Sequence, residues 1–240
     1  MAQVRLYVDQ PLAEGQSVHL PKDQAHYLFG VMRLSEGGVV HLFNGKEGEW
    51  EARVAKAGKK AGVLEVVRKT RALQMPPDLW LMFAPIKKAR TDFIVEKAAE
   101  MGVAKICPVR TDYTNSERVR RDRLQAHAVE AAEQCGGTFV PEVEELVPLA
   151  EKLRDWPEDR AIVFCDEALH GRSSALMGSL AGAPAALLIG PEGGFSPQER
   201  ERLHAHGQAQ AVSLGPRILR ADTAAVAALA LWQVACGDWT

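Results

Sequence analysis

Two glycine-containing segments near the C-terminus carry the residue types best suited to hold a small molecule. The first is Leu188-Ile189-Gly190-Pro191-Glu192-Gly193-Gly194, which follows an apolar run. Its glycines permit positive φ and let the backbone approach a ligand closely. It continues into Ser196-Pro197-Gln198-Glu199, a capping box with proline at the first helical position. The segment is neither a P-loop nor a dinucleotide fingerprint, and a tight strand-to-helix turn without a ligand is an equal alternative.

The second segment, Leu214-Gly215-Pro216-Arg217-Ile218-Leu219-Arg220, precedes an apolar helix for which Asp222 or Thr223 is the expected N-cap. Arg217 and Arg220 therefore stand before a helix N-terminus, where the helix dipole favours anions. Helix stability does not explain two cations there, but an anionic partner such as a phosphate or a deprotonated base does. The alternative is surface arginines paired with acidic neighbours.

The elements that must position these segments fall into two patterns. Residues 1–70 show short strands at 39–43, 50–54 and 62–67, a hairpin signal at Asn44-Gly45 and one helix at 23–33, which predicts a small β-barrel. After Pro76-Pro77, apolar runs alternate with helical spacing. We expect strands at 79–84, 106–109, 161–165, 185–189 and 211–214, and helices at 91–101, 121–135, 173–180, 197–206 and 223–235.

This alternation indicates an α/β domain with a parallel sheet, in which ligands collect at the carboxyl ends of the strands. Both segments follow predicted strands, so we expect them to converge around one site. The predicted domains are residues 1–72 and 73–240.

Composition limits the setting of the protein. The 240 residues have a net charge of −2, but 11 Lys and Arg stand against 8 Asp and Glu through Leu73, which permits nucleic acid to bind there. A plain solvated surface explains this weak imbalance equally well. The four cysteines form no C-x-x-C pair, which indicates no metal site and a reduced protein. No signal peptide is evident, and the apolar run at 224–232 is too short to span a bilayer, so we expect a soluble cytoplasmic protein.

Together the two segments resemble the SPOUT superfamily of RNA methyltransferases, and within it the bacterial 16S rRNA (uracil-N3)-methyltransferases. Supporting motifs are Glu96-Lys97-Ala98-Ala99-Glu100-Met101-Gly102, Glu130-Ala131-Ala132-Glu133-Gln134-Cys135-Gly136, Val31-Met32-Arg33-Leu34 and Leu42-Phe43-Asn44-Gly45. Asp222 stands where the family usually has Glu, Gly137 where it has Arg, and Asp112-Tyr113 where it has a Glu-Arg pair. If a family arginine contacted RNA there, the replacements nearby are Arg118, Arg120, Arg121 and Arg123, or these four form only a solvated helix start.

The resemblance implies an N-terminal PUA-like barrel and a C-terminal α/β domain tied in a trefoil knot. It also implies that the knotted loops bind S-adenosylmethionine and that two subunits form a homodimer. By motif position, the cofactor-binding residues are expected to be Asp166, Glu167, Leu188, Ile189, Gly190, Pro191, Glu192, Gly193, Gly194, Leu214, Gly215, Arg217, Ile218 and Leu219.

The implied reaction is methylation of N3 of a uridine in 16S rRNA of the small ribosomal subunit. Arg220 is expected to stabilise negative charge, and Asp222 to act as a base or only as a helix cap. Arg217 is expected to orient the RNA or the neighbouring subunit. The RNA-binding candidates are Arg5, Tyr7, Lys22, His26, Arg33, Lys87, Lys88 and Arg90, each of which could instead be an ordinary surface residue.

Two other functions compete with this one. One is ribose 2′-O-methylation of tRNA or 23S rRNA on the same scaffold. The other is a non-catalytic RNA-binding or ribosome-assembly factor.

Overall fold

The computed structural model describes residues 4–58, 60–116, 119–169 and 182–239. The chain divides into two compact units, the first comprising Met1–Met75 and Ala132–Val140 and the second Pro76–Ala131 and Pro141–Thr240. The first unit thus includes a segment from the middle of the chain. The sequence-based boundary at residues 72 and 73 stays a prediction.

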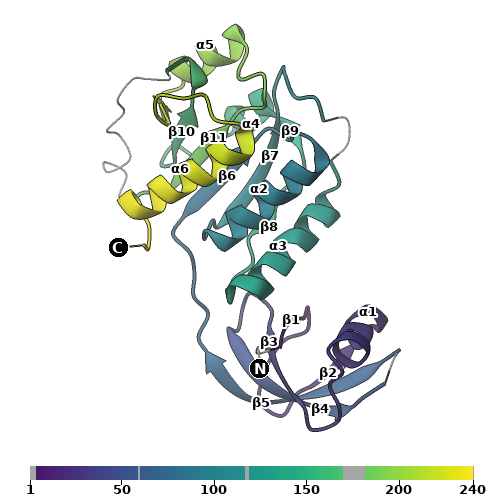
Figure 1. The fold of residues 1–240 in the computed structure, drawn as a ribbon. Helices are drawn as coiled ribbons and strands as arrows, with labels where there is room; N and C mark the ends of the chain where they lie inside the picture. Colours follow the sequence, from purple (N-terminus) through teal and green to yellow (C-terminus); the bar gives the residue numbers. More distant parts are fainter. Residues whose placement is uncertain (1–3, 59, 117–118, 170–181, 240) are drawn as a thin grey trace. The chain divides into compact units, whose positions relative to one another are not determined.

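The first unit is built on a mixed five-stranded sheet (Figure 1). Its strands are β1 (Arg5–Tyr7), β2 (Ser17–Leu20), β3 (Val39–Phe43), β4 (Glu49–Lys56) and β5 (Gly62–Arg71), in the order β1-β3-β4-β5-β2. Only the β1–β3 pair is parallel. Helix α1 (Lys22–Ala25) continues into the π-helix η1 (His26–Val31) between β2 and β3.

Strand alternation produces the core of this unit. Val40 and Leu42 of β3, Val18 of β2 and Leu64 of β5 are fully buried, and Leu28 of η1 packs into the same cluster. The predicted strand at 39–43, the hairpin after it and the helix near 23–33 are confirmed. Strands β1 and β2 were not predicted, because three- and four-residue strands carry too little alternation to stand out.

The second unit is a parallel sheet with helices on both faces, so the predicted α/β class is confirmed. Its strands are β6 (Leu79–Phe83), β7 (Lys105–Arg110), β8 (Glu142–Val143), β9 (Val147–Pro148), β10 (Ala161–Cys165), β11 (Ala185–Ile189) and β12 (Ala209–Val212). They run in the order β12-β10-β11-β6-β7-β8, with β9 also paired to β7, and every pairing is parallel.

The helices that cover this sheet are α2 (Lys88–Glu100), α3 (Arg121–Cys135), α4 (Leu149–Arg154), α5 (Pro197–Ala205) and α6 (Ala221–Cys236), with the short 3-10 helix η2 (Glu167–Leu169). Figure 1 shows α2 and α6 side by side across one face. On the other face, Leu149 of α4 and Leu203 of α5 pack against Phe164 and Leu188. The central strands are therefore buried on both sides, which explains their continuous apolar runs.

The structure differs from the sequence prediction in two respects. Strand β12 begins and ends two residues earlier than predicted, and α4, β8 and β9 were not predicted. The helix predicted at 173–180 lies outside the described residues. The knot stays a prediction. Within the described parts of the chain, no helix is both long and apolar enough to traverse a lipid bilayer.

Candidate functional site

A cavity of about 500 Å³ lies at the carboxyl ends of three adjacent strands of the second unit, β10, β11 and β12. This volume is within the range of small-molecule and cofactor sites. Both glycine-containing segments line it, so their predicted convergence is confirmed. The site forms here because parallel strands direct their following loops to one edge of the sheet.

Most residues that the sequence analysis assigned to a cofactor lie in the wall of this cavity. Those in the wall are Asp166, Glu167, Ile189, Gly190, Pro191, Glu192, Gly194, Leu214, Gly215, Arg217, Ile218 and Leu219. Gly193 is not among the lining residues, and Leu188 is fully buried within the sheet. Arg220 lines the cavity, and so do Lys87 and Arg90, which follow β6.

Glycine is required in the wall for different reasons at different positions. Gly194 has φ +69° and Gly215 φ +111°, backbone angles that residues other than glycine rarely adopt. A Cβ at Gly194 would also collide with the Glu167 carboxylate. Gly190 and Gly193 do not have positive φ, contrary to the expectation for all three glycines of the first segment. At Gly190 the constraint is space, because a Cβ there would lie 3.2 Å from the Phe195 ring.

The first segment is fixed by the start of α5. Ser196 caps the helix by accepting from the Glu199 backbone N–H, and the Glu199 side chain accepts from the Ser196 N–H at 3.0 Å. The predicted capping box is therefore confirmed. Ser196 and Glu199 are both buried, so these hydrogen bonds are shielded from water at the point where the first segment enters α5.

An arginine absent from the sequence analysis holds the acidic wall. Arg200 of α5 donates through Nε to Asp166 Oδ1 at 3.1 Å and through Nη2 to Glu167 Oε1. Asp166 is only 4% exposed, so a partner for its charge is needed. No local pattern pointed to Arg200, because it lies on a polar helix and its partners are 33 and 34 positions away.

The cations at the cavity differ in their partners. Arg90 Nη1 donates to Glu192 Oε1 at 3.0 Å, and its Nε lies 3.6 Å from Asp222 Oδ2. Arg90 thus connects the first segment to the start of α6. Lys87, Arg217 and Arg220 are exposed, and none forms an ion pair with another residue that the structure describes.

The prediction that Asp222 or Thr223 is the N-cap of α6 is wrong. The N-cap residue is Arg220, the helix begins at Ala221, and no side chain caps it. Asp222 Oδ1 instead accepts from the adjacent Thr223 N–H at 2.9 Å. Asp222 does not line the cavity, but its contact with Arg90 places it beside a residue that does.

Cys165 also contributes to the wall. Burial raises the pKa of its thiol to about 12. The thiol is therefore protonated near neutral pH, the form that is a poor nucleophile.

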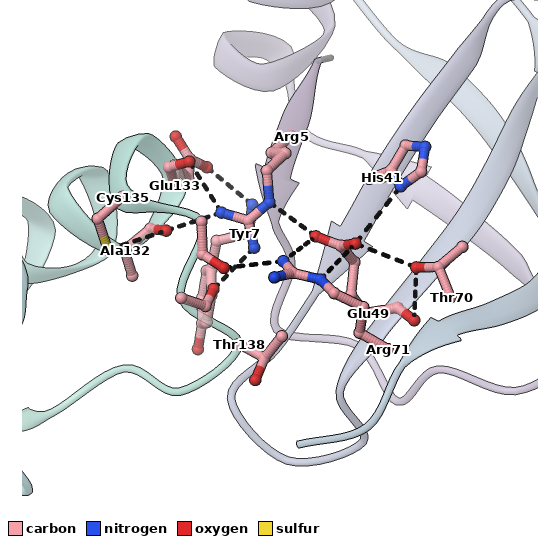
Figure 2. A network of polar contacts seen from close by, with 12 residues as sticks. Arg5, Tyr7, His41, Glu49, Thr70, Arg71, Ala132, Glu133, Cys135 and Thr138 are labelled. Carbon is pink, nitrogen blue, oxygen red and sulfur yellow. Dashed lines mark hydrogen bonds and ion pairs between the residues drawn. The ribbon is translucent and has the colours of Figure 1, made fainter. Parts of the chain in front are cut away.

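Arg5, an RNA-binding candidate, is committed to a polar network within the first unit (Figure 2). Its Nε donates to Glu49 at 2.7 Å, its Nη1 to the carbonyls of Ala132 and Glu133, and its Nη2 to the carbonyl of Gly137 at 2.7 Å. The Arg5 side chain is 10% exposed. The prediction that Arg5 binds RNA is therefore corrected. Arg5 has a structural role, because protein groups already accept its hydrogen bonds.

Glu49 is the centre of this network. Burial opposes its ionisation, but hydrogen bonds from Arg71 and Arg5, and their charges, lower the pKa of Glu49 to about 2. Arg71 also donates to the carbonyl of Gly136 at 2.8 Å. The two arginines thus satisfy carbonyls at and beyond the C-terminal end of α3, where cations are favoured.

The other RNA-binding candidates are spread over both units. Lys22, His26 and Arg33 are exposed on the first unit, and Arg33 is in the left-handed conformation with φ +56°. Tyr7 is half-buried and its ring packs edge-on against Phe43. Lys87 and Lys88 are exposed at the start of α2 on the second unit.

The basic cluster near α3 is partly engaged by protein groups. Arg121 donates to the carbonyl of Val143 at 2.9 Å, and Arg123 forms an ion pair with Asp92. Arg120 is exposed. Arg118 lies outside the described residues.

Comparison with known proteins places the chain. The family model described as an RNA methyltransferase domain matches residues 74–233, and the RNA methyltransferase PUA domain model matches residues 20–67. The ribosomal RNA small subunit methyltransferase E of Rickettsia conorii is 30% identical over 229 residues, which cover 94% of this chain and 93% of that protein.

Solved structures agree over the whole chain. The ribosomal RNA small subunit methyltransferase E of Neisseria gonorrhoeae, bound to S-adenosylmethionine, is 30% identical with a TM-score of 0.88, covering 99% of this chain and 100% of that one. A methyltransferase of Legionella pneumophila in complex with the same cofactor is 29% identical with a TM-score of 0.89 and the same coverage. The cavity-forming domain, the PUA domain and these full-length similarities show that the chain belongs to the ribosomal RNA small subunit methyltransferase E family.

Proposed function

We propose that this protein transfers a methyl group from S-adenosylmethionine to N3 of a uridine in 16S rRNA, and that it acts on the small ribosomal subunit as a homodimer. The observation that carries the proposal is the convergence of the two glycine-containing segments around one cavity. The relatives that bind S-adenosylmethionine share this fold over their full length.

The cavity wall fits S-adenosylmethionine in shape and chemistry. Gly190, Gly194 and Gly215 line the wall without side chains, so an adenine ring can approach the backbone closely there. Ile189 and Leu214 provide apolar surface for the ring. Asp166, Glu167 and Glu192 place carboxylates in a wall that would hold a positively charged sulfonium.

When bound, S-adenosylmethionine supplies a methyl group that is already activated by its sulfonium. The residues of the chain then position the uridine and manage its charge. N3 of uridine becomes a good nucleophile once it loses its proton, and the negative charge spreads onto O2 and O4. Arg220 stabilises that charge because its guanidinium has no carboxylate partner among the described residues.

Asp222 is the proposed base that takes the N3 proton. Its carboxylate is 21% exposed and lies beside Arg90, which orients it relative to the first segment. Arg217 orients the RNA or the partner subunit. Asp222 does not itself line the cavity, but the adjacent residue Ala221 does, so its carboxylate is close to the site.

RNA is held by phosphate contacts from Lys22 and Arg33 on the first unit and from Lys87 and Lys88 on the second. Each is exposed and free to reach a phosphate. The homodimer is supported by half-exposed apolar side chains at the end of α6 and just beyond it. These are Leu231 (51%), Val234 (60%) and Trp239 (51%). Sedimentation analysis of Leu231→Lys against the parent tests this assignment, with monomer expected for the variant.

The central experiment is methylation of unmodified small ribosomal subunits in vitro, followed by nuclease digestion and mass spectrometry of the 16S rRNA. One methyl on a uracil base is the expected product. A methyl on a ribose would identify a 2′-O-methyltransferase instead. RNA binding without turnover, and without heat of binding for S-adenosylmethionine in calorimetry, would identify a non-catalytic factor.

A further inference from the structure

A short turn after β7 presents an aromatic side chain next to the first glycine-containing segment, residues 188–194, here called the cofactor loop. In this turn, residues 111–114, the Thr111 N–H donates to Thr114 Oγ1 at 2.9 Å and the Thr114 N–H donates to the Thr111 carbonyl at 3.1 Å. The two hydroxyls also lie 2.9 Å apart. Asp112 and Tyr113 therefore occupy the tip of a closed turn.

The turn is anchored to the capping box of α5. The Asp112 N–H donates to Glu199 Oε1 at 2.9 Å, and the Ser196 hydroxyl donates to the Asp112 carboxylate. Thr111, Ser196 and Glu199 are each at most 4% exposed. The backbone that carries Tyr113 is thus held by buried hydrogen bonds, which fix the point from which its side chain extends.

Tyr113 lies against Gly193 of the cofactor loop. A Cβ at Gly193 would be 3.2 Å from Tyr113 Cβ and 3.5 Å from Cδ2, so the absence of a side chain there permits this close approach. The residues on either side of Gly193, Glu192 and Gly194, both line the cavity. Tyr113 is nevertheless 45% exposed, so much of the side chain remains open to solvent.

A solvent-exposed aromatic ring is suited to stacking on an unpaired nucleobase. RNA-binding proteins recognise single-stranded bases by stacking them on aromatic rings, and enzymes that modify an extruded base also contact the flanking nucleotides. Tyrosine loses little conformational entropy in such a contact, because its side chain has few rotatable bonds. Tyr113 does not line the cavity, so its position fits a neighbour of the modified nucleotide.

We propose that Tyr113 stacks on a nucleobase that flanks the target uridine and so positions the RNA at the cofactor cavity. The inference rests on the proposed function, because it assumes an RNA substrate at this cavity. It assigns a substrate-positioning role to a residue at which the chain departs from the family pattern noted in the sequence.

The test compares Tyr113→Leu, which removes the ring, with Tyr113→Phe, which keeps it. For each variant we would measure kcat and KM with small ribosomal subunits, and the Kd of S-adenosylmethionine by calorimetry. Tyr113→Leu is expected to raise KM for the RNA substrate about tenfold or more, the usual loss for one stacked base. Tyr113→Phe is expected to stay within about twofold of the parent, and neither variant should change cofactor affinity.

Three results would overturn the proposal. They are an unchanged KM for Tyr113→Leu, an equal loss in Tyr113→Phe, and a loss of cofactor affinity as large as the change in KM. Thermal unfolding of both variants checks that the turn is intact. Absence of methylation by the parent protein would count against the proposed function. Fluorescence anisotropy with an rRNA fragment measures RNA affinity without turnover, so it tests the stacking proposal independently of methylation.

Discussion

Arg90 and Arg220 border the same cavity in different electrostatic surroundings. Arg90 lies within 3.6 Å of two carboxylates, those of Glu192 and Asp222. Arg220 is exposed and has no such partner among the residues described. A cation that is already paired with carboxylates stabilises new negative charge on a substrate less than an unpaired cation does. The structure therefore favours Arg220 for charge stabilisation.

Replacing Arg220 with alanine should therefore lower kcat far more than it weakens cofactor binding. Its proposed partner is charge that develops only in the transition state, for which one missing donor costs about 100-fold or more in rate. Steady-state kinetics and calorimetry with S-adenosylmethionine measure the two effects. Arg202→Ala, on the exposed side of α5, is the control and should match the parent. Turnover of Arg220→Ala equal to the parent would remove the assigned role.

Gly190→Val should abolish S-adenosylmethionine binding. The Cβ of the new valine would lie 3.2 Å from the Phe195 ring, and its methyl groups would extend into the wall of the cavity. Calorimetry with the cofactor measures the outcome. Gly207→Ala is the matched control, because a Cβ at Gly207 has nothing within 4 Å. Cofactor affinity unchanged by Gly190→Val would contradict the placement of the cofactor.

At the scale of elements, the end of α3 is held by side chains of the first unit. Arg5 and Arg71 bridge Glu49 to four carbonyl groups, those of residues 132, 133, 136 and 137. This network explains why the segment Ala132–Val140 belongs to the first unit although it is distant in sequence. The Gly137 carbonyl, just beyond the end of α3, also serves as an acceptor for Arg5.

Glu49→Gln should lower the free energy of unfolding by about 2–3 kcal/mol, because it leaves two arginines without their shared carboxylate. This is below the cost for a fully buried pair, since the Arg71 side chain is 45% exposed. Urea denaturation measures the change. The matched control is Glu51→Gln, whose partner Arg68 is 64% exposed, and it should cost less than about 1 kcal/mol.

The same substitution predicts a change in pH dependence. The pKa of Glu49 is about 2 in the folded protein against an ordinary 4.5, so the folded state favours the carboxylate. Its stabilising contribution is complete above the ordinary pKa and is lost as the pH falls through the folded value. Unfolding free energy measured from pH 6 to pH 2 should thus fall less steeply in Glu49→Gln. Parallel curves for the two proteins would contradict this account.

At the scale of the whole molecule, exposed cations occur on both units while the net charge is −2. RNA binding must therefore depend on particular positive groups and not on overall charge. In the proposed function, Lys87 and Lys88 at the start of α2 are two such groups.

The double variant Lys87→Gln, Lys88→Gln should bind an rRNA fragment with a weaker dependence on salt. Each lost phosphate contact lowers the slope of log K against log salt concentration by about 0.7–0.9, so two lost contacts should be readily measured. Binding titrations between 50 and 200 mM salt would test this. Arg154→Gln, at an exposed position on α4, is the control and should keep the parent slope.

Much of the fold could be predicted from the sequence, because it depends on local patterns. Strands β3, β10 and β11 and helix α3 have the bounds that alternation and helical spacing indicated. Proline, glycine and capping residues marked the start of α5 in the same way. The convergence of the two glycine-containing segments also followed, since parallel strands end at one edge of a sheet.

Only the tertiary structure decided how individual side chains are used. Arg90 and Glu192 are 102 positions apart, and Arg5 and Gly137 are 132 apart, so no local spacing records either contact. From the sequence, Arg5 and Arg90 had the same prediction, that of a cation on the surface that could bind RNA. Folding buried one at a helix end and placed the other between two carboxylates at the cavity, because a charge acquires its role from the groups that surround it in space.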